Sequence, residues 1–406
     1  MSANEPAGDI ALRDRDADRG LVQGYLERLK SGDLGMLPVI FGVAVVWIVF
    51  YLQNHRFVSA FNLTNLSLQI CAVGIAAIGV VLVLLLGEID LALGSVSGLC
   101  AAIVVVMNLE HSVPGVLAVL LGLAAGAAVG LFHALVITQI GVPSFVVTLA
   151  GFIGWQGALL YVLGEGGARN VTDDFMLSLT DTFFGAAVAW PLVIALLVVM
   201  VALDHVARRR RIAAGLSDTA LAPLLVREVV ICVVAVVAVS VWTEDRGLPL
   251  AVLILVGLVI AFDLLVRRTL FGRHIFAVGG NKEAARRAGI NVNRIVTIVF
   301  VLSGTLAAAA GIMAASRGLA VNQQSGGGAF LLNAIAAAVI GGTSLFGGRG
   351  SVYAALLGAL VIGSVANGIA LLGLTSDYEQ MITALVLLAA VIVDAVARRG
   401  RQYAGR

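Results

Sequence analysis

The sequence is poor in charged residues, in cysteine and in aromatic residues. Charged side chains make up 12% of the 406 residues, whereas a soluble domain usually carries about 25%. The three cysteines, Cys71, Cys100 and Cys232, all fall inside apolar runs, which excludes a disulfide framework and fits small buried side chains. Aromatic residues are 6% of the chain, and 60% of all residues are hydrophobic. This composition indicates an integral membrane protein.

Lysine is nearly absent, since the chain contains Lys30 and Lys282 and no other lysine. Neither follows the G-x-x-x-x-G pattern that a phosphate-binding loop requires. The glycine-rich stretch from Ser325 to Gly328 also lacks a lysine. We therefore expect a protein that is not an enzyme and has no cofactor, no metal and no nucleic-acid partner. If ATP drives its action, another polypeptide must hydrolyse it.

Long hydrophobic runs follow one another through the chain. Each approaches the roughly 17–25 residues that a helix needs to cross a bilayer. They predict an all-α, polytopic membrane protein with about twelve transmembrane helices and no soluble domain. The runs lie at 36–53, 67–87, 91–108, 115–138, 144–163, 188–206, 226–242, 249–266, 295–317, 330–345, 350–373 and 378–396.

The basic residues predict the orientation of these spans. With the N-terminus inside, cytoplasmic segments hold all but four of the 26 lysines and arginines, the exceptions being Arg56, Arg169, Arg246 and Arg317. The positive-inside rule then places both termini in the cytoplasm of a multi-pass cell-membrane protein. We expect an acidic cytoplasmic tail (1–35), a transmembrane domain (36–396) and a short cytoplasmic tail (397–406).

Three predicted spans end with an acid four residues before an arginine. Such pairs suit interfacial ion pairs better than proton carriers, because they recur at the inner ends. The pairs are Asp204 with Arg208, Asp263 with Arg267 and Asp394 with Arg398.

The longest polar interruption in the C-terminal half, residues 272–292, predicts a short helix over 282–288. Gly279, Gly280 and Asn281 suggest a turn that ends in an N-cap. Glu283 in the first turn and Arg286 in the last match the helix dipole, and Gly289 supplies a left-handed stop. The remaining face carries alanines, Ala284 and Ala285 among them. Such a helix suits docking into a groove on a partner, or alternatively lying on lipid headgroups.

The stretch GRHIFAVGGNKEAARRAGINV resembles the cytoplasmic coupling loop of ABC-type monosaccharide permeases, the ribose and xylose importer family. The resemblance extends from about Phe57 to Arg399, and stretches such as LLLGEIDL and VPSFVVTL favour the xylose branch. It implies that this loop (267–294) contacts the ATPase subunit. The implied contact residues are Gly279, Gly280, Asn281, Glu283, Ala284, Ala285, Arg286 and Gly289.

The same resemblance implies the remaining partners and the function. Two copies of the permease would form the pore in membrane lipid, above two ATPase domains. An extracytoplasmic sugar-binding protein would deliver a monosaccharide, with D-xylose or a related pentose favoured. The segment 208–227 and the span after it would be an elaboration of a ten-span core.

Residues 87–94, GEIDLALG, interrupt what would otherwise be one apolar run. Glu88 and Asp90 are costly at membrane depth, so they should face a cavity or a polar turn. Either a broken helix lines the solute path there, or a tight cytoplasmic turn lets Asp90 cap the next helix. The stretch resembles the G-G-I-D-L-S-x-G signature of sugar permeases, with Glu88 and Ala92 departing from it.

Polar residues near an outer span end offer further candidates for the translocation path. Asn322 and Gln323 could donate to and accept from sugar hydroxyls, or could be solvated loop residues. Asn333, also a candidate for the path, and Asn367 fall within predicted spans, where hydrogen bonding between helices is the default explanation. His133 is expected to be a hydrogen-bonded packing residue.

Two other function classes remain open at the level of the sequence. A proton-coupled secondary sugar transporter would need an acid or histidine deep in a span, whereas most acids here lie at predicted inner edges. A non-transporting membrane scaffold would not depend on the 282–288 helix.

Overall fold

The computed structural model describes residues 37–214, 221–375, 377–389 and 392. The chain divides into two compact units. One contains residues 184–247, and the other contains residues 35–183 and 248–394. Both are built from helices, with four strands of two or three residues each in the described part.

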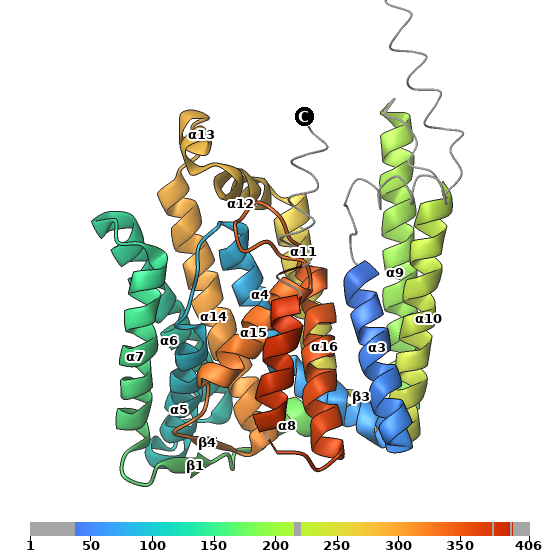
Figure 1. The fold of residues 1–406 in the computed structure, drawn as a ribbon, viewed down its shortest axis with the longest axis horizontal. Coiled ribbons are helices and arrows are strands. Elements are labelled where there is room, and N and C mark those ends of the chain that lie inside the picture. The colour runs from blue at the N-terminus through green and yellow to red at the C-terminus, as the bar shows by residue number, and fades with distance from the viewer. Residues whose placement is uncertain (1–36, 215–220, 376, 390–391, 393–406) are drawn as a thin grey trace, which may run out of the picture. The chain divides into compact units, whose positions relative to one another are not determined.

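The larger unit contains most of the helices (Figure 1). In chain order they are α3 (Leu37–Gln53), η1 (His55–Val58), α4 (Ala60–Leu85), α5 (Leu93–His111), α6 (Gly115–Leu135), η2 (Val136–Ile140), α7 (Ser144–Leu163), α8 (Asp174–Asp181), α11 (Leu250–Arg268), α12 (Leu270–Gly280), α13 (Lys282–Arg287), α14 (Val292–Gly318), α15 (Gly328–Ile340) and α16 (Val352–Leu371). Residues 377–389 are also helical. The strands are β1 (Ala168–Asn170), β2 (Phe183–Phe184), β3 (Leu248–Pro249) and β4 (Ala320–Asn322).

Nine helices in the described residues are long and apolar enough to cross a membrane. The predicted polytopic helical class is thus confirmed, while the count of twelve is not reached there. The run at 330–345 forms α15, which has 13 residues, about 20 Å at 1.5 Å per residue and too short for a 30 Å hydrocarbon core. The run at 36–53 forms α3, with 17 residues.

Helices α4 and α14 form the centre of the larger unit. The most apolar stretch of α4 is 89% buried, and α14 packs against α4, α5 and α6. Small residues permit the close approach, because Gly126 on α6 lies directly against the Gly304 backbone of α14. The small residues of 122–130 therefore serve helix packing.

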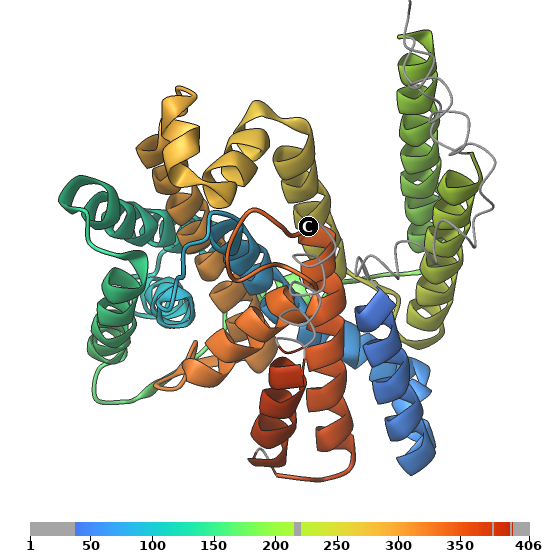
Figure 2. The same ribbon diagram turned by 45° about the horizontal axis from the view of Figure 1, so that its top comes forward.

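Opposite ends of the larger unit carry different structures. At one end, α12 and α13 connect α11 to α14 (Figures 1 and 2). At the other end β1 pairs antiparallel with β4, with Arg169 opposite Val321. Because α14 runs from Val292, just after α13, to Gly318, just before β4, it spans the distance between these ends.

The smaller unit consists of α9 (Ala186–Ala213) and α10 (Leu221–Asp245). Asp204 Oδ2 lies 3.4 Å from Nη2 of Arg227 on α10, which joins the two helices. In the larger unit the predicted pair is confirmed, with Arg267 Nε 2.8 Å from Asp263 Oδ1. Asp394 and Arg398 lie outside the described residues.

Candidate functional site: the short helix and the link beneath it

Helix α13 has the geometry that its sequence predicts. The Asn281 side chain accepts a hydrogen bond from the Ala284 N–H at 2.9 Å, which makes Asn281 the N-cap. Glu283 lies in the first turn, and Arg286 and Arg287 lie in the last. Gly289 has a φ of +83°, and the Ile290 N–H returns to the Ala285 carbonyl at 3.0 Å, as in a left-handed helix stop.

One face of α13 packs against the protein, and the rest is exposed. Ala285 is 4% exposed, whereas every other residue from Asn281 to Gly289 is exposed. The helix therefore presents polar and charged side chains outward from the end of the unit. Of the residues predicted to contact an ATPase, the following lie on this outward surface: Asn281, Glu283, Ala284, Arg286 and Gly289.

The prediction of a turn at Gly279 and Gly280 is wrong. Both residues are the last of α12, whose N-cap is Thr269 and whose buried face includes Ile275 and Val278. Two consecutive glycines favour a turn locally. Here, however, the absence of a side chain at Gly279 allows close packing of α12 against another helix. A Cβ on Gly279 would overlap the Leu85 carbonyl oxygen and lie 2.7 Å from the Gly348 nitrogen. Glycine thus allows α12 to rest directly on the end of α4.

Beside this contact, α4 ends and an irregular link of residues 86–92 begins. Gly87 has a φ of +72°, and the Gly348 N–H donates to the Leu85 carbonyl at 3.0 Å. Gly347 also lies against Gly279 and Gly87, at distances that leave no room for a side chain. Three chain segments therefore meet through backbone atoms at the end of α4.

An ion pair joins α13 to the link. Lys282 Nζ lies 2.5 Å from Glu88 Oε1, and the Ser144 hydroxyl at the start of α7 donates to Glu88 Oε2 at 2.6 Å. The Ile89 N–H donates in turn to Ser144 Oγ at 3.3 Å. The Glu88 side chain is 12% exposed and that of Lys282 is 43% exposed. One carboxylate is therefore shared between the exposed helix and the packed bundle.

Asp90 lies deeper, and its carboxylate bonds both the start of α5 and the middle of α14. Ala92 is the N-cap of α5 and makes no side-chain capping bond. Asp90 Oδ1 accepts from the Ala92 N–H at 3.0 Å, and the Ser303 hydroxyl donates to Asp90 Oδ2 at 3.1 Å. Ser303 is about 17 Å along α14 from Val292, near the middle of that helix. The link therefore descends into the bundle, as Figure 1 shows between α4 and α5.

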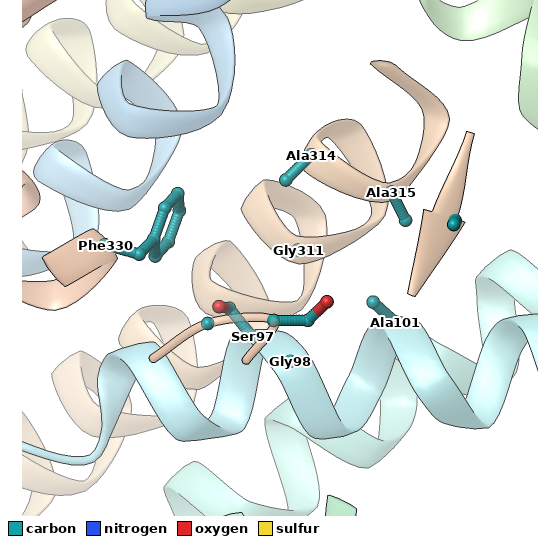
Figure 3. A pocket seen from close by; sticks show the side chains of 10 residues that line it. Ser97, Gly98, Ala101, Gly311, Ala314, Ala315 and Phe330 are labelled. Atoms are coloured by element: carbon teal, nitrogen blue, oxygen red, sulfur yellow. The ribbon is translucent and has the colours of Figure 1, made fainter. Parts of the chain in front are cut away.

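A small cavity lies beyond the start of α5. It measures about 70 Å³ and is lined by Ser97 and Gly98 of α5, Gly311 of α14, the loop at Ser325 and Gly326, and Phe330 of α15 (Figure 3). Ligand sites for small molecules usually measure about 300–1,000 Å³. The space in this conformation suits water rather than a sugar ring.

The remaining candidates for the path do not gather at one place. Asn322 lies in β4, where its side chain accepts from the Gln324 N–H at 2.8 Å. The Gln323 carbonyl accepts from Gln156 Nε2 at 2.7 Å. Asn333 is half-buried on α15. Glu88 and Asp90 lie on the link toward the other end of α14, so the structure separates the five residues into distinct groups.

Two buried polar residues behave as packing residues. Asn367 of α16 and Asn62 of α4 donate to each other's side-chain oxygens, at 3.2 and 2.7 Å. Trp155 Nε1 lies 2.9 Å from His133 Nε2. Both predictions of hydrogen bonding between helices are confirmed. Sequence reasoning did not single out Asn62, Ser144 or Ser303, which read as isolated polar residues in apolar runs.

The chain resembles a set of transport proteins along nearly its full length. The family described as the permease component of the branched-chain amino acid transport system matches residues 62–391. The chain belongs to this permease family. No solved structure gave a match.

The relatives of this family member include sugar permeases. The xylose transport system permease protein XylH of Escherichia coli K12 is 33% identical over 93% of this chain and 95% of its own length. XylH of Haemophilus influenzae is 34% identical over 90% of this chain and 98% of its own length. The ribose import permease protein RbsC of Escherichia coli K12 is 32% identical over 84% of this chain and 88% of its own length.

Proposed function

We propose that this chain is the membrane-spanning subunit of an ATP-driven ABC importer for a pentose, D-xylose foremost, in the cytoplasmic membrane. The observation that carries the proposal is α13, a capped helix between two apolar helices that exposes all but one of its residues. A short exposed helix of this kind is stable because α12 and α14 hold both of its ends. Its outward surface is available to a soluble partner.

In this proposal the outward surface of α13 binds the ATPase subunit. The residues in contact are those predicted from the sequence, except that Gly279, Gly280 and the buried Ala285 act through the placement of α13 rather than by contact. Two copies of the chain enclose the path within the lipid. Asn322 and Gln323 lie at the mouth that receives sugar from an external binding protein, and Asn333 lies further along the path on α15.

The substrate class rests on the named relatives, because the family description alone points to amino acids. Relatives named for xylose cover 93% and 90% of this chain. A pentose is neutral and polyhydroxylated, so the permease needs no buried charge to receive it.

Co-purification of the tagged chain with its membrane partners tests the proposal. Wild type is expected to retain an ATPase subunit that Glu283→Arg and Gly289→Leu lose, since the first reverses a charge on α13 and the second removes its stop. Glu165→Arg, a matched charge reversal in the loop before β1, is expected to retain the subunit. If wild type retained no ATPase in mild detergent, the proposed importer function would be wrong.

The same preparation identifies the substrate. ATP hydrolysis by the complex with its binding protein is expected to rise with D-xylose more than with ribose or leucine. A response to leucine alone would assign the chain to amino acid transport. Sugar uptake by the purified chain alone, driven by a pH gradient, would instead support a proton-coupled transporter.

A further inference from the structure

The irregular link of residues 86–92 is fixed to two different parts of the protein. Near its start, Glu88 binds Lys282 of α13 and Ser144 of α7. Near its end, Asp90 binds Ser303 at the middle of α14. The link thus extends from the exposed helix to the interior of the bundle.

The contact with α13 is strong enough to carry the link along when α13 moves. Glu88 is mostly buried, and separating it from Lys282 would leave a carboxylate with one hydroxyl donor, which is costly away from water. The backbone contact of Gly279 with Leu85 resists a displacement of α12 without α4. Moving residues 85–88 together with α13 therefore costs less free energy than breaking these contacts.

The link can pass such a shift on because it lies between two helices without being helical itself. Residues 88–90 have no regular secondary structure, so their dihedral angles can change without breaking a helical turn. Helix α5 begins directly after the link and contributes Ser97 and Gly98 to the cavity. A displacement of the link changes the position of the residues that line this space.

We propose that the Lys282–Glu88 ion pair transmits movement of α13 to α5 through the link. The inference rests on the proposed function, and it makes Lys282 and Glu88 positioning residues that need not touch sugar. Lys282 and Glu88 are separated by 194 residues in the sequence, so the pair ties the loop between α11 and α14 to the first half of the unit.

The test uses the assembled importer in lipid vesicles, with its ATPase subunit and binding protein. Two quantities are measured, the rate of sugar-stimulated ATP hydrolysis and the amount of D-xylose accumulated. Glu88→Gln and Lys282→Met are expected to keep hydrolysis while the sugar moved per ATP falls about fivefold, since a partly exposed ion pair contributes on that order. The charge-swapped double variant, Glu88→Lys with Lys282→Glu, is expected to restore the sugar moved per ATP to near the wild-type value.

The matched control is Arg246→Met, which removes an ion pair of 3.1 Å with Asp245 and is expected to leave the ratio unchanged. If Lys282→Met releases the ATPase subunit, Glu88→Gln carries the test, because it leaves the surface of α13 intact. A wild-type ratio in Glu88→Gln, or a double variant no better than the single ones, would overturn the proposal. Absence of sugar-stimulated hydrolysis in wild type would instead overturn the proposed function.

Discussion

Asp90 is a buried carboxylate whose two oxygens have different partners. One oxygen accepts from the Ala92 N–H, and the other accepts from the Ser303 hydroxyl. Its depth along α14 matters for function, because an acid deep among the helices is what a proton-coupled transporter would need. Sequence reasoning placed most acids at the inner edges and left open whether this one lies at membrane depth or in a tight turn.

Substitution at Asp90 separates a structural role from a proton-carrying role. Asp90→Asn keeps an oxygen for the Ala92 N–H and places an amide against the Ser303 hydroxyl, so ATP-driven uptake is expected to continue. Asp90→Leu leaves both donors unpaired, at a cost of about 1–3 kcal/mol each. Uptake assays and thermal denaturation midpoints in detergent check both variants. Loss of uptake in a stable Asp90→Asn protein would favour proton coupling.

Local signals at α13 were readable from the sequence, and long-range ones were not. Asn281 and Gly289 act on backbone groups within a few residues, so their cap and stop follow from residue type. The partner of Lys282 lies 194 residues away, and no local pattern encodes that distance. Gly279 was misassigned for the same reason, since its close neighbour is the Leu85 carbonyl.

At the scale of the helices, glycines have two different environments. A Cβ added to Gly126 on α6 would overlap the Gly304 carbonyl oxygen and lie 2.8 Å from the Ala308 Cβ. Gly154 on α7 has open space around it. The same residue type therefore allows close packing in one helix and lies at an exposed position in the other.

Alanine substitutions at these two glycines are expected to have opposite effects. Gly126→Ala forces a Cβ against backbone that cannot rotate away, and overpacking of this kind costs about 1–3 kcal/mol. Gly154→Ala meets nothing and gains up to about 1 kcal/mol of helix propensity. Thermal denaturation of both variants in detergent measures the difference. Equal midpoints would show that the α6–α14 contact is not close in the folded protein.

The length and hydrophobicity of the apolar runs predicted the uninterrupted membrane-spanning helices. They did not predict the structure where a helix is interrupted. The runs at 67–87 and 91–108 correspond to α4 and α5, but their spacing alone did not show that the link descends between them. Helix α12 was not predicted, because glycines lie near both of its ends. Its buried face includes Ile275 and Val278. The cavity depends on Gly98, Gly311 and Gly326 meeting from separate segments, which is information about the whole fold.

At the scale of the whole molecule, the distribution of basic residues predicts the membrane orientation. The loop at Glu165 lies before β1, and α13 lies at the opposite end of α14. The importer proposed here requires α13 to face the cytoplasm, where ATP is available. The positive-inside rule supports the same orientation.

Cysteine labelling in intact cells checks this orientation. In a background without Cys71, Cys100 and Cys232, Glu165→Cys is expected to react with a membrane-impermeant maleimide. Arg287→Cys, whose native side chain is 81% exposed, is expected to react only after the membrane is permeabilised. The reverse pattern would place α13 outside and exclude its contact with an ATPase.

The scarcity of lysine has a chemical consequence for the Lys282–Glu88 ion pair. Lys282 is the single lysine among the residues that the structure describes, so amine-selective acylation has one side-chain target there. Contact with the Glu88 carboxylate shields the Lys282 amine from the reagent, and breaking the pair exposes it. The acylation rate of Lys282 in the working importer therefore reports whether the pair stays closed, as transmission of movement through it requires.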